Sequence, residues 1–341
     1  MASKINVGVI GVGRIGRMHV RNLTTQVPDA RVVAVADIIE EAAHQVAATY
    51  NVPEAYGDPR YIIEHKDIDA VVICSSTDTH AMLIEQAAEA GKHIFCEKPL
   101  DLDLARIDQV LAKVDAAGVK LQVGFQRRFD PSFRRARDLI AEGKIGEPHI
   151  VRITSRDPGP PPLAYIKVSG GIFLDMTIHD FDMSRFLTGD EAEEVFAVGN
   201  VLVDPQIGEV GDIDTAIVTM RFRQGSLVTI DNSRKAVYGY DQRIEVLGSK
   251  GMVAVGNKVP DHVLYADDAG IHTAKPVYFF IERYTEAYVA EMQAFIQAIV
   301  EDTEPLVTGV DGRMPVVMGY AAKKSLAEGR PVRLEEVDTR K

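Results

Sequence analysis

The chain has 341 residues, more than one hydrophobic core usually serves, so we expect two domains. Hydrophobic residues make up 46% of the sequence and charged residues 26%, which are ordinary values for a globular protein. The formal net charge of −12 argues against nucleic acid or an anionic membrane as the main partner, so we expect neither.

Residues 1–4 lead straight into an apolar strand, and the sequence contains no secretory h-region, twin-arginine segment or long apolar span. We therefore expect a cytoplasmic protein. Cys74 and Cys96 lie at the ends of predicted strands, where buried thiols are a better interpretation than a disulfide. The nine histidines form no His-Glu-x-x-His motif and no Cys/His cluster, so we expect no metal.

Strands and helices alternate along the first third of the chain. The predicted strands cover residues 5–10, 31–36, 55–56, 70–74, 93–96 and 120–123. The predicted helices follow a glycine-rich turn at 11–16 and then cover residues 40–50, 59–65, 81–90 and 104–117. This alternation with short joints predicts a doubly wound parallel sheet, the Rossmann fold.

The pattern changes near residue 124. Helices are predicted at 134–142, 173–187, 282–301 and 313–328. Strands separated by tight turns are predicted at 150–156, 195–203, 215–222, 226–231, 243–247, 252–255 and 263–265. We therefore predict a dinucleotide-binding domain at 1–124 and an α+β domain at 125–341 for substrate binding and oligomerisation. Its large, mostly antiparallel sheet has too few helices to cover both faces, which predicts a homo-oligomer, with a tetramer favoured.

A glycine-rich turn, Gly-Val-Gly-Arg-Ile-Gly at residues 11–16, joins the first strand to the first helix. G-x-G-x-x-G in this setting is the dinucleotide-binding fingerprint. Gly11 permits the tight turn, Gly13 lets the backbone approach a pyrophosphate, and Gly16 allows close packing of helix on strand. The helix start, with Arg14 and Ile15, offers N–H groups and a partial positive charge to the phosphates. Three glycines in an ordinary turn are the alternative.

Asp37 follows the second strand at about the spacing, twenty residues past the glycines, where the fingerprint places its ribose-binding acid. Its carboxylate can accept hydrogen bonds from ribose hydroxyls and would repel a 2′-phosphate. Residues 38–41, Ile-Ile-Glu-Glu, supply no arginine to hold that phosphate. The sequence therefore predicts NAD rather than NADP as cofactor.

A second loop, Ser-Ser-Thr-Asp-Thr-His at residues 75–80, follows the fourth strand. Open α/β sheets bind ligands at the carboxyl ends of their strands. We therefore expect Ser75, Thr77 and His80 to lie along the ribose and nicotinamide of the cofactor. Ordinary helix capping explains the same residue types and could operate alongside cofactor contact.

Three further residues could carry chemistry. Lys98, in the segment Glu97-Lys98-Pro99 after the fifth strand, could reach a substrate hydroxyl near the nicotinamide; a solvated surface lysine is the alternative. Asp175 and His179 are four residues apart, so they would share one face of a helix. An aspartate beside a histidine stabilises the imidazolium and suits a general base, although a plain helix pair explains the spacing equally well.

With these segments together, the chain resembles a known family, the sugar and polyol dehydrogenases grouped around glucose–fructose oxidoreductase and inositol 2-dehydrogenase. The resemblance extends nearly end to end. It rests on the glycine turn, on Glu97-Lys98-Pro99, and on the segment from Gly-Gly at 170–171 to His-Asp at 179–180. The stretch Gln-Val-Gly-Phe-Gln-Arg-Arg-Phe-Asp at 122–130 is similar to the inositol 2-dehydrogenase subgroup.

The resemblance implies roles for these residues. Lys98 would bind the reacting hydroxyl, His179 would take its proton, and Asp175 would support the histidine. Glu97 and Lys98 would also line the cofactor site, and the Lys98–Pro99 bond would be cis. Family members are usually dimers or tetramers built on the open face of the C-terminal sheet, which agrees with the prediction above.

The resemblance also implies an enzyme that oxidises a ring hydroxyl of a cyclic polyol with NAD, in the first place myo-inositol to 2-keto-myo-inositol (scyllo-inosose). Besides Lys98, Asp175 and His179, we expect substrate contacts from polar side chains of the second domain and its border, for which ordinary packing is an equally good explanation. These candidates are Arg127, Arg156, Asp157, Tyr238, Tyr240 and Tyr284.

Two alternatives remain open at this point. The substrate could be another inositol isomer, an aldose such as glucose, or a carboxylate-bearing sugar held by Arg127 and Arg128. The chain could also be a dinucleotide-sensing regulator without catalysis, because a fold alone does not establish an activity. The presence of Lys98, Asp175 and His179 together favours the enzyme.

Overall fold

The computed structural model describes residues 4–340, and the chain divides into two compact units. The first unit contains residues up to Phe129 together with Glu286–Met314. The second contains Asp130–Thr285 together with the residues from Pro315 onward. The single boundary expected after residue 124 therefore differs from the observed division, because the chain returns to the first unit near its end. Residues 1–3, on which part of the expectation about a leader rests, lie outside the described residues.

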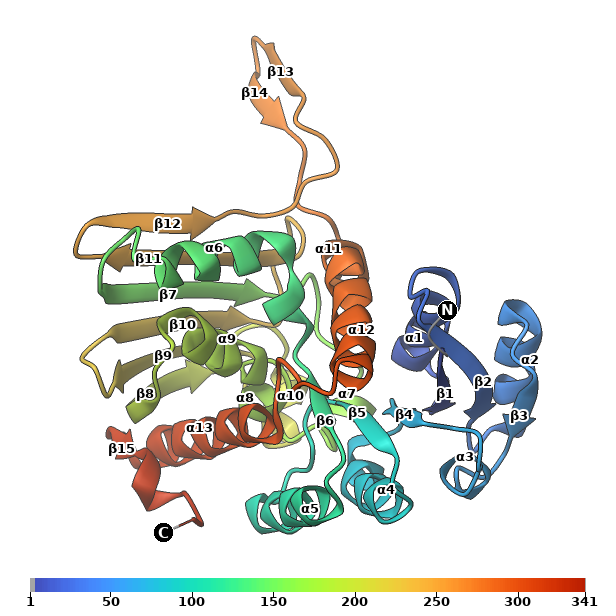
Figure 1. Ribbon diagram of the computed structural model, residues 1–341. Helices are drawn as coiled ribbons and strands as arrows, with labels where there is room; N and C mark the ends of the chain where they lie inside the picture. The colour runs from blue at the N-terminus through green and yellow to red at the C-terminus, as the bar shows by residue number, and fades with distance from the viewer. Residues whose placement is uncertain (1–3, 341) are drawn as a thin grey trace. The chain divides into compact units, whose positions relative to one another are not determined.

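The first unit is built on a six-stranded parallel sheet in the order β3-β2-β1-β4-β5-β6 (Figure 1). This is the Rossmann order, with its switch point between β1 and β4. Its strands are β1 (Ile5–Ile10), β2 (Ala30–Ala36), β3 (Glu54–Tyr56), β4 (Ala70–Ile73), β5 (His93–Glu97) and β6 (Leu121–Gly124). Its helices are α1 (Arg14–Thr25), α2 (Glu40–Tyr50), α3 (Arg60–Ile63), α4 (Thr77–Glu89), α5 (Leu104–Ala117) and α12 (Thr285–Val300), with a 3-10 turn at Gln126–Phe129.

The core of the first unit explains why α12 belongs to it. Val7, Val9 and Val72 of the central strands have no exposed surface, as expected where helices cover both faces of a parallel sheet. Met292 and Phe295 of α12 pack into the same core cluster and are equally buried. A local apolar pattern predicts that α12 has a buried face, but it does not say which domain buries it.

The second unit is built on a seven-stranded sheet in the order β12-β11-β7-β10-β9-β8-β15. Only the β7–β10 pair is parallel among its paired strands in the described part of the chain, so the predicted mostly antiparallel sheet is confirmed. Its strands are β7 (Pro148–Arg156), β8 (Ala192–Asn200), β9 (Thr215–Phe222), β10 (Leu227–Ser233), β11 (Asp241–Gly248), β12 (Gly251–Val255) and β15 (Val332–Arg333).

Helices lie against one face of this sheet. Figure 1 shows α6 (Pro131–Ala141) and α9 (Ile178–Thr188) in front of the strands. α13 (Gly309–Glu328) lies beside β8, where the Ala197 N–H donates to Ser325 Oγ at 3.0 Å. The remaining elements are short: α7 (Leu163–Ile166), α8 (Ile172–Asp175), α10 (Pro205–Glu209), α11 (Phe280–Arg283) and a 3-10 turn at Leu334–Glu336.

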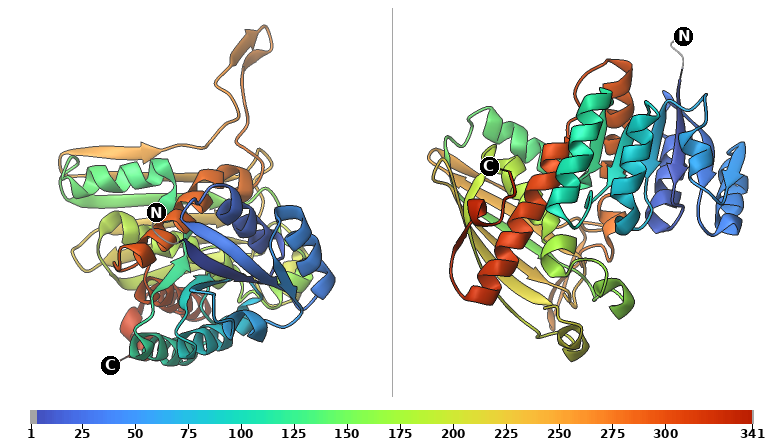
Figure 2. Two further views of the ribbon diagram at one scale, coloured as in Figure 1. Left: turned by 45° about the vertical axis from the view of Figure 1, so that its right-hand side comes forward. Right: turned by 90° about the horizontal axis from the view of Figure 1, so that it is seen from below.

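The strand expected at 263–265 does not join the large sheet. It becomes β13 (Leu264–Asp267), which pairs only with β14 (Gly270–Thr273) and projects from the rest of the second unit as a hairpin (Figures 1 and 2). Across residues 4–340, none of the helices is long and apolar enough to cross a membrane.

The helix expected at 173–187 is broken in two. α8 ends at Asp175 and α9 begins at Ile178. At the break, the Thr177 N–H donates to the Ile172 carbonyl at 2.9 Å, five residues back, where a regular helix would bond four residues back. The Thr177 hydroxyl contacts the same carbonyl and also Asn232 on β10, at 2.6 Å. A threonine side chain that competes for backbone groups in this way disfavours a continuous helix.

Candidate active site

The glycine turn is shaped by close backbone contacts in the first unit. Gly11 has φ +86°, and a Cβ there would lie 2.6 Å from the Ser75 nitrogen. A Cβ on Gly16 would lie 1.8 Å from the Gly11 carbonyl oxygen, so α1 could not reach its place beside β1. Gly13, in contrast, has no atom within 4 Å of the position that a Cβ would take. The space in front of Gly13 and the first N–H groups of α1 suits a pyrophosphate.

Asp37 stands at the carboxyl end of β2 and holds the glycine turn. One carboxylate oxygen accepts from the Val12 N–H at 2.8 Å, and the other accepts from the Ile39 N–H at 2.9 Å. Each oxygen keeps a second lone pair for a ribose hydroxyl. Arg14 at the start of α1 is exposed and Ile15 half-buried, as expected for the rim of a cofactor site.

His80 joins two loops at the carboxyl edge of the sheet. Its ring is 2% exposed, with Nδ1 2.8 Å from the Pro99 carbonyl and Nε2 3.1 Å from the Ser75 carbonyl. Ser75 Oγ also lies 2.7 Å from Thr79 Oγ1 at the start of α4, while Thr77 begins that helix. Because both ring nitrogens face protein carbonyls, His80 ties the loops together, a role that no local sequence pattern indicates.

Lys98 lies just past β5, and the Lys98–Pro99 bond is cis, as the resemblance implied. Beside it, the Glu97 carboxylate lies 2.8 Å from Nε2 of His19, a fully buried residue of α1. The His19 ring packs edge-on against Phe95 of β5 and Tyr288 of α12. Glu97, the residue before Lys98, is therefore held in place by the core of the first unit.

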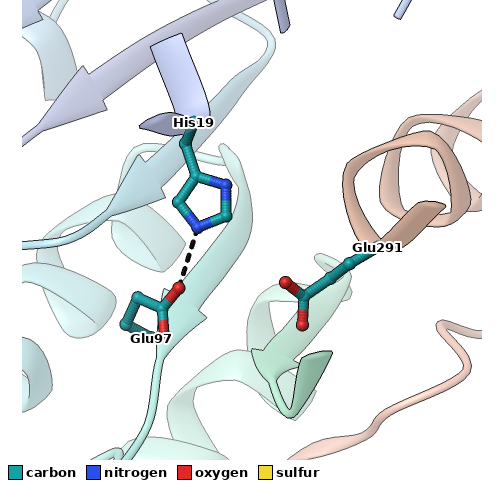
Figure 3. Close-up of side chains that lie close together, drawn as sticks. All are labelled: His19, Glu97 and Glu291. Carbon is teal, nitrogen blue, oxygen red and sulfur yellow. Dashed lines mark hydrogen bonds and ion pairs between the residues drawn. The ribbon is translucent and has the colours of Figure 1, made fainter. Parts of the chain in front are cut away.

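Glu291 on α12 completes this buried cluster (Figure 3). The ligand atoms of His19, Glu97 and Glu291 all lie within 4.8 Å of one another. Glu291 has no exposed surface, and neither of its carboxyl oxygens has a hydrogen-bond partner among the described residues. Burial, with the nearby charge of Glu97, raises the pKa of Glu291 well above its usual range, so we interpret it as a neutral acid.

The same three residues are the group in the described chain that could hold a metal ion. Two carboxylates would balance a divalent charge. However, an imidazole that binds a metal almost always donates its second N–H to a partner, and Nδ1 of His19 has none among the described residues. The donor set therefore fits a protonated glutamic acid better than a metal centre.

Asp175 and His179 lie on either side of the break between α8 and α9, so the shared helix face assumed from their spacing is not regular helix. Asp175 Oδ1 accepts from the Tyr165 hydroxyl at 2.8 Å, and its Oδ2 lies 3.2 Å from Nη1 of Arg234. Neither partner belongs to α8 or α9. His179 is half-buried and is the second residue of α9.

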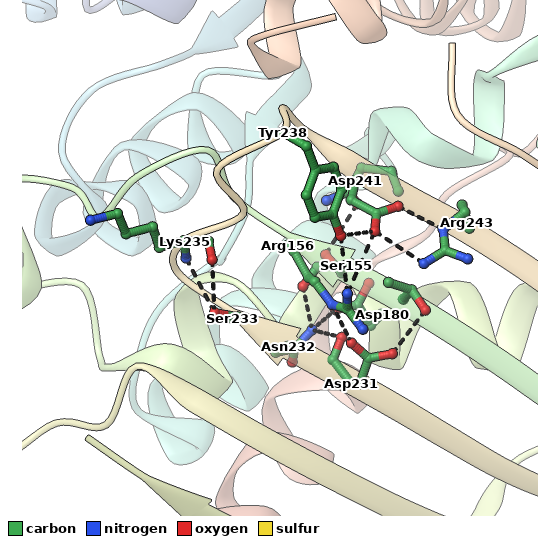
Figure 4. A network of polar contacts seen from close by, with 12 residues as sticks. Ser155, Arg156, Asp180, Asp231, Asn232, Ser233, Lys235, Tyr238, Asp241 and Arg243 are labelled. Carbon is green, nitrogen blue, oxygen red and sulfur yellow. Dashed lines mark hydrogen bonds and ion pairs between the residues drawn. The ribbon is translucent and has the colours of Figure 1, made fainter. Parts of the chain in front are cut away.

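The expected substrate side chains Arg156 and Tyr238 belong to one polar network across β7, β10 and β11 (Figure 4). Arg156 donates to Asp231 at 2.6 Å and to the Tyr238 hydroxyl at 3.0 Å. That hydroxyl donates in turn to Asp241 at 2.6 Å. Both side chains retain exposed surface, so the network orients them without burying them.

The other expected substrate residues are placed differently. Arg127 in the 3-10 turn is only 5% exposed, Tyr240 is 5% exposed, and Tyr284 is fully buried. The two tyrosine rings pack edge-on against each other at 6.1 Å. Asp157 directly follows β7, and its backbone N–H donates to the Ser233 carbonyl at 2.9 Å. Substrate contact by these four residues stays a prediction.

Four residues around Asp175 were not predicted from the sequence: Tyr165, Asp212, Asn232 and Arg234. Asn232 is buried on β10 and donates to Asp180 at 2.8 Å (Figure 4), and Asp180 directly follows His179 in the sequence. Arg234, the residue after β10, is 1% exposed. An arginine three residues past the predicted strand at 226–231 carries no local signal of burial, so only the assembled unit identifies it.

The sheet order, the glycine turn and the aspartate after β2 define a class, the dinucleotide-dependent oxidoreductases with a Rossmann unit. Residues 5–125 match the family model described as "Oxidoreductase family, NAD-binding Rossmann fold", and residues 133–254 match "GFO/IDH/MocA C-terminal domain". The chain belongs to this GFO/IDH/MocA oxidoreductase family, as the resemblance predicted. It is an NAD-dependent oxidoreductase acting on CH–OH donors.

Similar proteins match nearly the whole chain. Myo-inositol 2-dehydrogenase of Thermotoga maritima is 51% identical over 98% of this chain and 99% of its own length. A solved dehydrogenase structure from Thermotoga maritima has a TM-score of 0.96 at 51% identity, covering 98% of this chain and 100% of that one. Scyllo-inositol dehydrogenase of Lactobacillus casei, solved with NAD(H) and scyllo-inositol, has a TM-score of 0.91 at 31% identity, with 98% and 100% covered.

Proposed function

We propose that this enzyme oxidises a ring hydroxyl of a cyclic polyol, first of all myo-inositol to 2-keto-myo-inositol. The observation that carries the proposal is the similarity over nearly the full length to myo-inositol 2-dehydrogenase of Thermotoga maritima. The structure solved with NAD(H) and scyllo-inositol supports the same substrate class. The residues present fit NAD, since a Cβ-free backbone at Gly13 and an anchored Asp37 stand where pyrophosphate and ribose bind in this fold.

His179 is the proposed general base, and it removes the hydroxyl proton of the substrate. Lys98, a compact ammonium group at the carboxyl edge of the sheet, stabilises the negative charge that develops on the same oxygen. Asp175 stabilises the imidazolium that forms. Bound NAD supplies the hydride acceptor. Arg156 and Tyr238 are proposed to hold further hydroxyls, because their shared network keeps them in one orientation.

The decisive experiment follows NADH absorbance with myo-inositol, scyllo-inositol, chiro-inositol and glucose as substrates. His179→Ala and Lys98→Arg should each lower kcat about 10²–10⁴-fold, and His179→Ala should leave NAD affinity near that of the wild type. Lys98→Arg should fail because a planar fork does not replace a compact ammonium. His262→Ala, at an exposed position, is the matched control.

Near-wild-type turnover by the His179 variant would disprove the proposed base. If the enzyme prefers another inositol isomer or glucose, the proposed substrate is wrong, but the proposed catalytic roles are unaffected. If the protein binds NADH but turns over none of these substrates, the alternative of a dinucleotide-sensing regulator without catalysis is favoured.

The oligomer is proposed on the open face of the large sheet. Met252, Leu247, Ile150 and Leu227 are aligned neighbours on β12, β11, β7 and β10. They form one apolar row, and their exposed fractions are 52%, 43%, 37% and 53%. A continuous apolar row on a sheet usually marks an interface. We infer a homotetramer in which this row meets its copy.

We also propose a cytoplasmic location. Both cysteines are free, and burial raises the pKa of each thiol well above its usual range. Unpaired thiols are typical of a reducing compartment. Fractionation of cells carrying the tagged protein tests the location directly.

A further inference from the structure

Arg234 places a buried positive charge beside Asp175. Its side chain is 1% exposed, and its Nη1 lies 3.2 Å from Asp175 Oδ2. Its Nη2 lies 3.5 Å from Oδ2 of Asp212, in the segment between α10 and β9. One guanidinium, which cannot lose its charge in a protein, is therefore shared between two carboxylates.

Asp212 also fixes the helix that carries Asp175. Its Oδ1 accepts at 3.0 Å from the N–H of Ile172, the first residue of α8, which has no cap from its own preceding residue. Gly171 leaves room for this contact, since a Cβ there would lie 2.8 Å from Asp212 Oδ1. Arg234 and Asp212 thus hold both ends of α8.

We propose that Arg234 and Asp212 are positioning residues that tune the proton affinity of His179, by setting how much of the negative charge of Asp175 acts on it. The proposal rests on the proposed function, in which His179 is the base and Asp175 its support. A carboxylate beside an imidazole favours the protonated ring, and a cation bound to that carboxylate weakens this effect. Arg234 therefore lowers the proton affinity of His179, which leaves the ring free to act as a base. Asp212 shares the charge of Arg234 and so makes this lowering smaller.

The two residues should act in opposite directions. Without the charge of Arg234, the negative charges of Asp175 and Asp212 are uncompensated, and we expect the His179 ring to hold its proton to higher pH. Without the charge of Asp212, Arg234 neutralises Asp175 more completely, and the ring loses its proton at lower pH. A residue with a merely structural role would lower turnover without moving the pH profile in either direction.

Other titratable groups face the same cluster from neighbouring elements. Desolvation and the charge of Asp175 raise the pKa of Tyr165, so its hydroxyl on α7 remains a neutral donor. Burial lowers the pKa of Lys323 on α13, and the charge of Asp212 opposes that shift. Asp157 after β7 also acts on Tyr165 through its charge, and Asp180 on α9 accepts from Asn232 at 2.8 Å. Only Lys323 among these is expected to respond to a change at Asp212, so it needs its own control.

The test measures kcat and kcat/KM against pH with myo-inositol and NAD for Arg234→Gln, Asp212→Asn and the double variant. The acid limb should move up by about 0.5–1 pH unit in Arg234→Gln and down by a similar amount in Asp212→Asn. It should return near the wild-type position in the double variant, because the removed charges cancel. NAD affinity should change less than about twofold in all three, since the cofactor residues belong to the first unit.

Asp212→Asn keeps an oxygen that can accept from Ile172, so it tests the charge even if Arg234→Gln does not fold. Lys323→Gln should leave the acid limb in place. Reduced turnover with an unmoved limb in both single variants would overturn the inference and show that the two residues serve structure only. Retained activity of His179→Ala would instead overturn the proposed function, and the two failures are therefore distinguishable.

Discussion

A buried carboxyl group without a hydrogen-bond partner is costly when ionised. At Glu291 this cost determines the pKa of the carboxyl group. Burial raises its pKa well above the usual range, with the charge of Glu97 adding to the shift. The sequence predicts an apolar face for this helix, and nothing in the local pattern distinguishes Glu291 from an exposed glutamate. The raised pKa of Glu291 is a consequence of the assembled core, where α12 meets β5 and α1.

Replacement of Glu291 by Gln should change how stability depends on pH. In the wild type, the folded state keeps its proton above the pH at which the unfolded chain has released it. Stability is therefore full below the unfolded pKa and falls as pH rises toward the raised folded value, by up to about 1.4 kcal/mol per pH unit. Glu291→Gln carries no titrating proton, so urea unfolding between pH 5 and 8 should show a flatter dependence.

Glu286→Gln, an exposed position on the same helix, is the control and should keep the wild-type slope. If Glu291→Gln retains the full slope as well, Glu291 is ionised in the folded protein, and a bound cation becomes the better interpretation of the cluster.

Asp37 has two functions that substitution can separate. Asp37→Asn keeps an oxygen for the Val12 N–H but removes the negative charge that repels a 2′-phosphate. We expect the NAD:NADP ratio of kcat/KM to fall at least about tenfold, the equivalent of 1.4 kcal/mol. Steady-state kinetics with both cofactors measures this ratio. An unchanged ratio would show that Asp37 serves the glycine turn alone.

Among the secondary-structure elements, the strands and helices of the first unit are largely predictable, because apolar runs, glycine turns and short polar joints mark them in the local sequence. The helix expected at 173–187 is not, since its break depends on contacts of Thr177 with Asn232, a residue 55 positions away. The break matters for the site, because Asp175 and His179 stand on its two sides. Spacing of four residues found the pair without describing its geometry.

The glycine turn offers a matched pair of substitutions. Gly16→Ala should destabilise the protein by about 1–3 kcal/mol, because its methyl group would overlap the Gly11 carbonyl. Gly13→Ala should unfold like the wild type, since its methyl group meets no protein atom, but should lose about tenfold in NAD affinity. Thermal unfolding and NAD titration distinguish the two. If Gly13→Ala binds NAD as tightly as the wild type, the pyrophosphate does not bind in the space before Gly13.

For the molecule as a whole, the apolar row on the large sheet predicts self-association. Leu227→Asp places a charge in that row, and burying it against a second copy would be costly. We expect the tetramer to dissociate at micromolar concentration, as measured by light scattering. Leu306→Asp, at a position about equally exposed but outside the sheet, should leave the assembly intact. A wild-type protein that is already monomeric would contradict the proposed interface.

Short-range patterns in the sequence are enough to establish the Rossmann sheet, the mostly antiparallel second sheet, the NAD preference and the family. These patterns are strand periodicity, a glycine turn, an acid at fixed spacing and the Glu-Lys-Pro segment. Three other features required the assembled fold: α12 returns to the first unit, Glu291 stands with Glu97 and His19, and Arg234 lies between two carboxylates. The contacts behind them join residues far apart in the chain, 78 positions between His19 and Glu97 and 59 between Asp175 and Arg234. Burial and charge at such separations depend on how the elements pack, which no local pattern encodes.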